Sequence, residues 1–422
     1  MPKEVPEWSE IPDHNIPEEQ GKLPSKHTSL LLGAGFSVNQ GYPTANQLND
    51  RIKDFDPEKY SISGEGNLFK LSDSEKDPFW FYSDAKRKHF LKELIHLFLQ
   101  SNSEFDYEEF YDFLVDPSLL ENDAFKATAQ AFRKKFNLES DDHLFEYGDS
   151  RLVDKTITLV NQIIEVLLVD GQGRNFYKPI HQMKPLPHEY TGFLQLLEKL
   201  GKDSIVHIHS LNHDIFFETF CHTDWINSEL SNGFEELGSK FYARMEDSVM
   251  IRLAYFNDKY DARFRLYKLH GSIDQFPFRH EDGSPTEYIK IKKGVNISNL
   301  YKEVYNEERE YYYENDFTNY YADFLSGTSN KILSYDRGYY KVVFTHFVEN
   351  LKNSEQLIIV GYGCRDSKIN ELILENFDFG NKPVFIVDPY PSEHVKILAD
   401  KLGAKIIEQT PDRPLLGIID SI

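Results

Sequence analysis

The stretch that most constrains this chain is a short apolar run that ends in a glycine turn, Ser-Leu-Leu-Leu-Gly-Ala-Gly-Phe-Ser at residues 29–37. The run before Gly33 predicts a buried strand, because a short apolar run bounded by glycine is typical of strands covered on both faces. Gly33 and Gly35 lack a Cβ, so the backbone can turn sharply and approach a ligand closely. Residues 45–48 can open a helix. A strand, a glycine turn and a helix start favour a bound anion, although an ordinary tight turn also fits.

Further short apolar runs recur along the chain, between stretches with helical spacing. The predicted strands are residues 29–32, 205–209, 264–269, 357–360, 384–387 and 406–407. The predicted helices are residues 85–100, 107–114, 152–168 and 191–200. Short apolar strands separated by helical stretches predict an α/β fold with a Rossmann-like, doubly wound parallel sheet.

The same pattern predicts three parts of the chain. They are an amino-terminal arm at 1–26, a discontinuous sheet domain at 27–60 and 201–422, and a large helical insertion at 61–200. The arm carries prolines that break regular structure, and it is either disordered or laid on a neighbouring subunit. The tyrosine-rich segment 301–324 either packs its own rings or forms a protein interface, where tyrosine is enriched.

Composition narrows the class of protein. The 47 basic and 69 acidic side chains give a formal net charge of −22, which repels nucleic acid, so direct nucleic-acid binding is not expected. The two cysteines, Cys221 and Cys364, can build neither a cysteine-only zinc site nor a disulfide framework. The first 24 residues lack the apolar core of a signal peptide, and no run is apolar enough to span a bilayer. These features predict a cytoplasmic protein with no membrane partner.

Polar turns follow five of the predicted strands and hold the candidate site residues. These turns are residues 33–37, 210–214, 268–272, 361–366 and 388–389. The carboxyl ends of parallel strands share one edge of a sheet, where ligands of doubly wound folds collect. We therefore expect the turns to form one ligand site.

The order of these turns resembles that of the sirtuin family. Residues 33–37 match the sirtuin Gly-Ala-Gly-x-Ser turn, which holds the NAD diphosphate. Asn212 and Asp214 match the turn beside the nicotinamide ribose, and His270 with its following glycine matches the catalytic histidine. The resemblance implies a sirtuin-like fold, NAD as substrate, and Asn212 and His270 as catalytic residues. The implied cofactor-binding residues are Gly33, Ala34, Gly35, Phe36, Ser37, Pro43, Thr44, Ser210, Asp214, Gly361, Tyr362, Gly363 and Asp388.

The chain also departs from sirtuin deacylases. Its two cysteines cannot form the four-cysteine zinc module of those enzymes, Leu211 replaces a glutamine, and the helical block replaces a smaller loop. These departures resemble the sirtuin-like proteins of bacterial antiphage defence, which destroy NAD. A chain of this size without a nucleic-acid-binding or repeat domain most resembles the partner of a HerA-type ATPase. The resemblance implies a homo-oligomer, a HerA-type partner and no bound metal.

The residue types of the turns suit cleavage of the bond between nicotinamide and ribose, which builds positive charge on the sugar. The Asn212 amide can hold a water or the ribose, since it offers a donor and an acceptor. His270 can accept a proton near neutral pH. Asp214 can accept ribose hydroxyl groups or stabilise the developing cation. An Asn-x-Asp sequence is also a common capped turn, and a histidine before glycine is often structural.

Together these residues predict an NAD glycohydrolase that depletes NAD in antiphage defence by abortive infection. A protein deacylase with the same NAD site and a non-catalytic NAD or ADP-ribose sensor are the alternatives. His207 and His209 alternate onto one face of a strand and could bind a metal, although no carboxylate partner is indicated. Asp366 could bind ribose or cap the helix that starts near Ser367.

Overall fold

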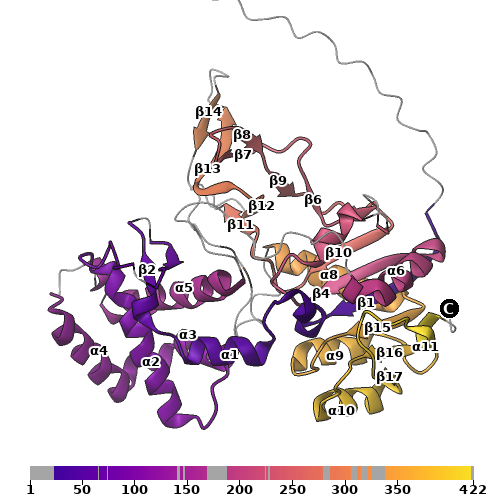
Figure 1. The fold of residues 1–422 in the computed structure, drawn as a ribbon, viewed down its shortest axis with the longest axis horizontal. Coiled ribbons are helices and arrows are strands. Elements are labelled where there is room, and N and C mark those ends of the chain that lie inside the picture. Colours follow the sequence, from indigo (N-terminus) through magenta and orange to yellow (C-terminus); the bar gives the residue numbers. More distant parts are fainter. Residues whose placement is uncertain are drawn as a thin grey trace, which may run out of the picture.

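The computed structural model describes residues 23–419, apart from 65, 74, 140–142, 146–147, 169–187, 224, 227–228, 279–285, 306–310, 315–321, 323 and 325–337. Residues 1–22 of the predicted arm, and Tyr320 and Tyr321 of the tyrosine-rich segment, lie outside the described residues. Figure 1 shows a helical lobe on the left, a parallel-sheet domain on the right and a lobe of antiparallel strands above them.

The sheet domain contains, within the described residues, a seven-stranded sheet in the order β17-β16-β15-β1-β4-β10-β5, with parallel pairing between all neighbours. Its strands are β1 (Lys26–Leu32), β4 (Ser204–Ser210), β5 (Leu230–Ser231), β10 (Phe264–Lys268), β15 (Gln356–Val360), β16 (Val384–Val387) and β17 (Lys405–Ile407). The predicted fold class is confirmed. Because the strand order runs outward from β1 in both directions, the carboxyl end of β1 is a topological switch point.

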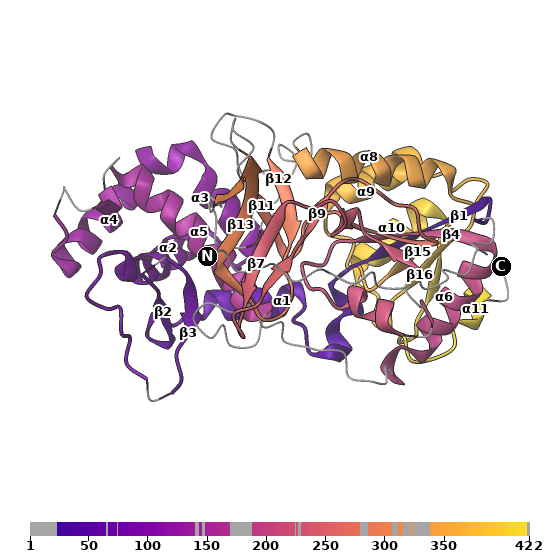
Figure 2. The same ribbon diagram turned by 90° about the horizontal axis from the view of Figure 1, so that it is seen from above.

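Helices cover both faces of this sheet, which explains its near-continuous apolar strands. Leu30 and Leu32 face the cluster that includes α6 (Thr191–Asp203) and α11 (Leu416–Ile419), and Leu31 faces the opposite cluster. That second cluster includes α8 (Gly338–Asn353), α9 (Ser367–Asn376) and α10 (Glu393–Leu402). Figure 2 shows the sheet between these two helix layers. No helix in the described part of the chain is long and apolar enough to cross a membrane.

The helical lobe follows the glycine turn. Its elements are α1 (Ala45–Lys53), β2 (Tyr60–Ile62), β3 (Leu68–Lys70), α2 (Arg87–Ser101), α3 (Tyr107–Val115), α4 (Asp123–Phe136) and α5 (Asp149–Leu168). Helix α1 begins at a capping box, in which Thr44 and Gln47 satisfy each other's backbone N–H groups. It packs on α3 and α5, whereas α6, which spans the predicted boundary at residue 200, packs on β4. Helix α1 therefore belongs to the helical lobe, and α6 belongs to the sheet domain.

The antiparallel lobe lies between β4 and α8 in the sequence and was not predicted. Its strands are β6 (Phe234–Glu235), β7 (Phe241–Met245), β8 (Met250–Arg252), β9 (Ala254–Phe256), β11 (Gln275–Phe278), β12 (Glu287–Lys290), β13 (Val295–Tyr305) and β14 (Tyr311–Glu314). They form two sheets, β11-β12-β9-β6 and β14-β13-β7-β8, in the described residues. Part of the tyrosine-rich segment 301–324 is thus the β13–β14 pair.

Candidate functional site

The turns that follow β1, β4, β10 and β15 meet at the carboxyl edge of the parallel sheet. The N–H of Gly35 donates to the carbonyl of Gly361 at 2.9 Å, and the N–H of Leu269 donates to the carbonyl of Ser210 at 2.9 Å. The N–H of Leu211 reaches the carbonyl of Leu32 at 2.9 Å. These backbone bonds join turns that are far apart in the sequence, so the edge is one connected set of loops.

The glycines of the first and last turns are explained by their mutual contact. A Cβ on Gly33 would lie 2.6 Å from the Cα of Tyr362, and one on Gly35 would lie 2.9 Å from the carbonyl oxygen of Gly361. Gly361 has φ +63°, and its Cβ would lie 2.3 Å from the backbone nitrogen of Phe36. The missing side chains therefore let two turns pack backbone against backbone. Gly363 differs, because nothing lies within 4 Å of the position of its Cβ.

Asn212 is buried at this edge, and its orientation is determined by its partners. Its Nδ2 donates to the carbonyl of Gly33 and to Oγ of Ser37, both at 3.0 Å. Both partners accept, so the atom that faces them must be the amide nitrogen. Asn212 is only 7% exposed, and its Oδ1 has no hydrogen-bond partner among the described residues. The amide therefore offers the site an acceptor, and not the donor and acceptor that its residue type suggested.

Asp214 holds the Ser37 side chain that accepts from the Asn212 amide. Its carboxylate accepts hydrogen bonds from the Ser37 side chain and from the N–H of Phe216, the latter at 2.9 Å. Burial raises the pKa of Asp214, and the nearby ammonium group of Lys268 acts in the opposite direction. Lys268 is itself buried, donates to the Asp214 carbonyl and lies 3.7 Å from Glu218. Ser37 thus links the Asn212 amide to a buried carboxylate.

His270 lies on the turn that follows β10, next to the turn that carries Asn212. The N–H of Ile273 donates to the carbonyl of His213 at 2.9 Å, which holds the His270 turn against the Asn212 turn. His270 is 5% exposed, and its Nε2 lies 3.5 Å from Oδ2 of Asp366. The other carboxylate oxygen of Asp366 caps α9 by accepting from the N–H groups of the second and third helical residues. The capping role considered for Asp366 is therefore present, and the histidine contact accompanies it.

The remaining predicted residues lie at the same edge, and several have structural partners. The Phe36 ring is buried against Tyr190, Phe193, Phe216, Phe217 and Phe220, so it anchors the turn in the core. Ser210 Oγ accepts from the Asn212 N–H at 3.2 Å. Pro43 is buried before the α1 cap.

Two further predicted residues hold the outer turns of the edge. The Tyr362 hydroxyl donates toward the Asp366 carbonyl and lies near Oδ1 of Asn370, each at 3.0 Å. Asp388 accepts from the Tyr390 N–H at 2.8 Å, one strand away from the centre of the site. Ala34 is partly exposed in the glycine turn.

His207 and His209 lie in the middle of the sheet, away from this edge. Burial lowers the pKa of His207 to about 3, and it lowers that of His209 well below its usual value. His207 Nε2 contacts His27 Nδ1 at 2.8 Å, and the His209 ring packs on Tyr267 and Phe347. Across the residues with described positions, no group of three or more His, Cys, Asp or Glu side chains could hold a metal ion.

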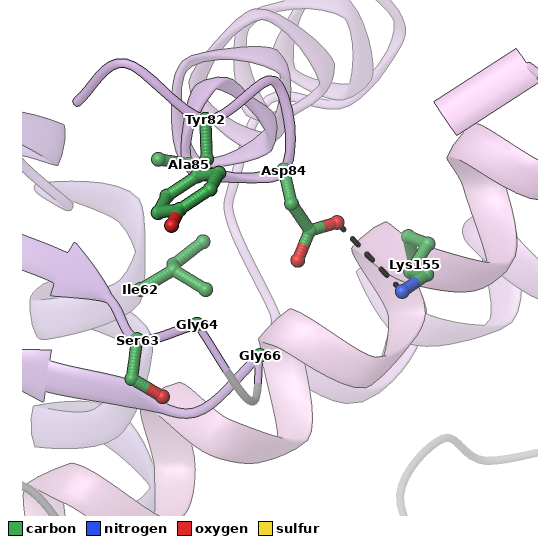
Figure 3. A pocket seen from close by; sticks show the side chains of 8 residues that line it. All are labelled: Ile62, Ser63, Gly64, Gly66, Tyr82, Asp84, Ala85 and Lys155. Carbon is green, nitrogen blue, oxygen red and sulfur yellow. Dashed lines mark ion pairs between the residues drawn. The ribbon is translucent and has the colours of Figure 1, made fainter. Parts of the chain in front are cut away.

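A separate pocket of about 310 Å³ lies in the helical lobe (Figure 3). It is lined by Ile62, Ser63, Gly64, Gly66, Tyr82, Asp84, Ala85 and Lys155. Its two charged side chains pair with each other, since Lys155 Nζ lies 3.7 Å from Asp84 Oδ1. None of the predicted site residues lines it, and the edge of the parallel sheet remains the candidate site.

Sequence reasoning missed the partners of the site residues. The contact of Asp366 with His270 and the place of Lys268 beneath Asp214 join separate strands. Both Asp366 and Lys268 lie within predicted site turns, but the sequence does not show which side chain each of them meets.

One family model matches the part of the chain that forms most of this sheet. Residues 206–407 match the family model of the SIR2-like domain, which spans the sheet from β4 to β17. A solved structure described as "Structural Basis for the Mechanism and Regulation of Sir2 Enzymes" matches at 12% identity and a TM-score of 0.32, covering 94% of this chain and 92% of that chain. No curated protein sequence matches. The family match supports a sirtuin-like fold, and because SIR2-like domains use NAD, it supports NAD as the substrate.

Proposed function

We propose that this chain is an NAD glycohydrolase, which uses water to cleave NAD into nicotinamide and ADP-ribose. The observation that carries the proposal is the Asn212 amide, whose N–H groups are both held by the protein while its buried Oδ1 has no partner in the described structure. A buried acceptor without a donor costs about 1–3 kcal/mol. A water or a ribose hydroxyl that enters the site supplies the missing donor.

The reaction breaks the C–N bond between ribose and nicotinamide and forms a C–O bond from water. Nicotinamide leaves as a neutral ring, and the water loses one proton. Asn212 Oδ1 accepts a hydrogen bond from the water or from a ribose hydroxyl, and His270 accepts the proton. Asp214 acts through Ser37, because its buried carboxylate accepts from the Ser37 side chain and from the N–H of Phe216.

Exposed backbone at the same edge is a candidate contact for the rest of the substrate. Gly35 and Gly363 are exposed, and open space surrounds the Cβ position of Gly363. Arg365 is exposed in the same turn and donates to Asn46 Oδ1 of α1 at 3.2 Å. Exposed backbone beside a guanidinium group suits a diphosphate, since arginine pairs well with phosphate oxygens.

The biological role that we propose is depletion of NAD in antiphage defence, by a homo-oligomer that works with a HerA-type ATPase. The support is the resemblance of the glycine turn, the Asn212 and His270 turns and the zinc-free composition to that group of proteins. A free NAD hydrolase would harm its own cell, so restraint by a partner is expected. Light scattering of the purified chain and a pull-down from the native host test this role. A monomer with full activity and no captured ATPase contradicts it.

The decisive experiment is chromatography of NAD incubated with wild type, with Asn212→Ala and with wild type plus an acetylated peptide. Where activity needs a partner, the partner is present in every sample. We expect ADP-ribose and nicotinamide from wild type alone, and almost none from Asn212→Ala, since positioning can supply roughly 7–11 kcal/mol of a barrier. The control is Asn381→Ala, whose amide donates to Asp378 in an exposed turn. It should retain activity.

Two outcomes of this experiment contradict the proposal. O-acetyl-ADP-ribose formed only with the peptide would assign the site to a deacylase. NAD that binds but is never consumed under any activation would make the chain a sensor.

A further inference from the structure

We propose that Asp366 is the positioning residue of His270, and that it performs this role with the carboxylate oxygen that helix capping leaves free. The proposal rests on the hydrolase function above for its effect on turnover, but the pairing itself concerns only this chain. Asp366 lies on the turn between β15 and α9, and His270 follows β10. The pair therefore joins two loops on opposite sides of β1 and β4.

The two oxygens of Asp366 have separate partners. Oδ1 accepts from the N–H of Lys368 at 3.0 Å and from the N–H of Ile369 at 3.1 Å. Oδ2 lies 3.5 Å from His270 Nε2. The cap fixes the carboxylate plane at the start of α9, so Oδ2 has little freedom to turn away from the imidazole.

The backbone of the Asp366 turn is also held. The Tyr362 hydroxyl donates to the Asp366 carbonyl at 3.0 Å, and the Asn370 amide donates to the Cys364 carbonyl at 2.9 Å. Cys364 has φ +57°, a conformation that non-glycine residues adopt only when their surroundings impose it. A turn held in this way is suited to present one side chain in one direction.

The pair is largely buried, so water screens the interaction between the Asp366 carboxylate and the His270 ring only weakly. The side chains of His270 and Asp366 are 6% and 17% exposed. A carboxylate this close to Nε2 favours a proton on that nitrogen and stabilises the imidazolium form of His270. This is the role that a buried carboxylate plays toward a catalytic histidine in other hydrolases.

Within the described residues, other titratable or charged groups lie near the pair. The His213 ring centroid lies 6.3 Å from that of His270, on the turn after β4. Tyr107 of α3 is buried, and Asp366 contributes to the raised pKa of Tyr107. Arg365 is exposed on the same turn as Asp366. Asp366 is the carboxylate found in ion-pair contact with His270 within the described structure.

The test replaces Asp366 by asparagine, which caps a helix as well as aspartate does but has no charge. Asp366→Ser is the second variant, because serine also caps but is too short to reach His270. Asp116→Asn is the matched control, since Asp116 caps the short helix Pro117–Glu121 through the Ser118 N–H on the exposed surface. All variants are made in the full chain, and their melting temperatures check that each is folded.

The main readout is an NMR titration of the His270 ring, which does not depend on turnover. Asp366→Asn and Asp366→Ser should lower its pKa by about one unit or more, because the opposite charge is lost. Asp116→Asn should leave the pKa unchanged. An unchanged His270 pKa in both Asp366 variants overturns the proposal.

The second readout is the pH profile of NAD cleavage, with the partner present if activity needs it. Asp366→Asn should lower kcat by about tenfold or more with little change in KM, and it should move the acidic limb of the profile to lower pH. A parallel loss in the control, or a rise in KM alone, contradicts a positioning role. If wild type cleaves no NAD at all, the hydrolase proposal fails, while the NMR titration still decides the pairing.

Discussion

The middle of the parallel sheet and its carboxyl edge both bury polar side chains, but the hydrogen bonding of these side chains differs between the two regions. In the middle, His209 is fully buried and packs on aromatic rings, and neither of its ring nitrogens has a hydrogen-bond partner in the described part of the chain. At the edge, Asn212 has two partners for its donors and one acceptor left over. The difference teaches that burial alone does not mark a site. A better indication of a site is a buried polar group whose orientation is fixed by hydrogen bonds while one of its atoms can still bond a ligand.

The largest effect should come from the edge, where His270→Ala removes the proposed general base. NAD cleavage should fall by roughly 10²- to 10⁴-fold, while the melting temperature stays close to that of wild type. His394→Ala is a control on the exposed face of α10. Turnover at the wild-type rate in a folded His270→Ala variant would remove this histidine from the mechanism.

The next effect concerns the contact that holds the edge together. Gly361→Ala places a Cβ 2.3 Å from the Phe36 backbone nitrogen in a residue with positive φ. The free energy of unfolding should fall by a few kcal/mol, about 1–3 from the backbone alone, as measured by chemical denaturation.

Gly363→Ala is the matched control in the same turn, because its Cβ meets nothing within 4 Å. It should leave stability unchanged and report, by calorimetry, whether NAD approaches that backbone. Equal stability of the two variants would show that the two glycine turns do not pack as described. Gly35→Val should also strain this contact, because a Cβ on Gly35 would lie 2.9 Å from the carbonyl oxygen of Gly361.

Near neutral pH, the smallest effect comes from the middle of the sheet. His207 and His209 are neutral in the folded chain because burial lowers the pKa of each, that of His207 to about 3. The unfolded chain, with a histidine pKa of 6.5, therefore binds more protons below that pH. Stability should be complete above pH 6.5 and fall as the pH drops toward 3, by at most about 1.4 kcal/mol per pH unit for each histidine.

His209→Phe should sharpen this contrast. It removes two unpartnered nitrogens, so stability at pH 7 should be equal or higher, and the slope of stability against pH should decrease. Catalysis should not change. His394→Gln, on the exposed side of α10, is the control and should leave the slope unaltered. An unchanged slope in His209→Phe would show that His209 is not the neutral group assigned here.

Sequence reasoning succeeded where the signal was local. The β1 run, the glycine turn and the helix start at residues 45–48 are each patterns of a few neighbouring residues, and the structure has a strand, a turn and a helix there. It failed for the antiparallel lobe. Strands such as β6 and β8 span only two or three residues with mixed exposure, so no alternation is long enough to detect.

By itself, the sequence determined the fold class and the turns that form the candidate site, because apolar runs, glycines and polar turn residues act over short distances along the chain. Only the tertiary structure decided what each side chain does. The Asn212 amide meets the Gly33 carbonyl across 179 residues, and His270 meets Asp366 from another strand. Such pairs are set by strand order and by the packing of turns at a shared edge. The packing of these turns leaves Asn212 with an acceptor to offer, and it lets Asp366 both cap α9 and contact His270.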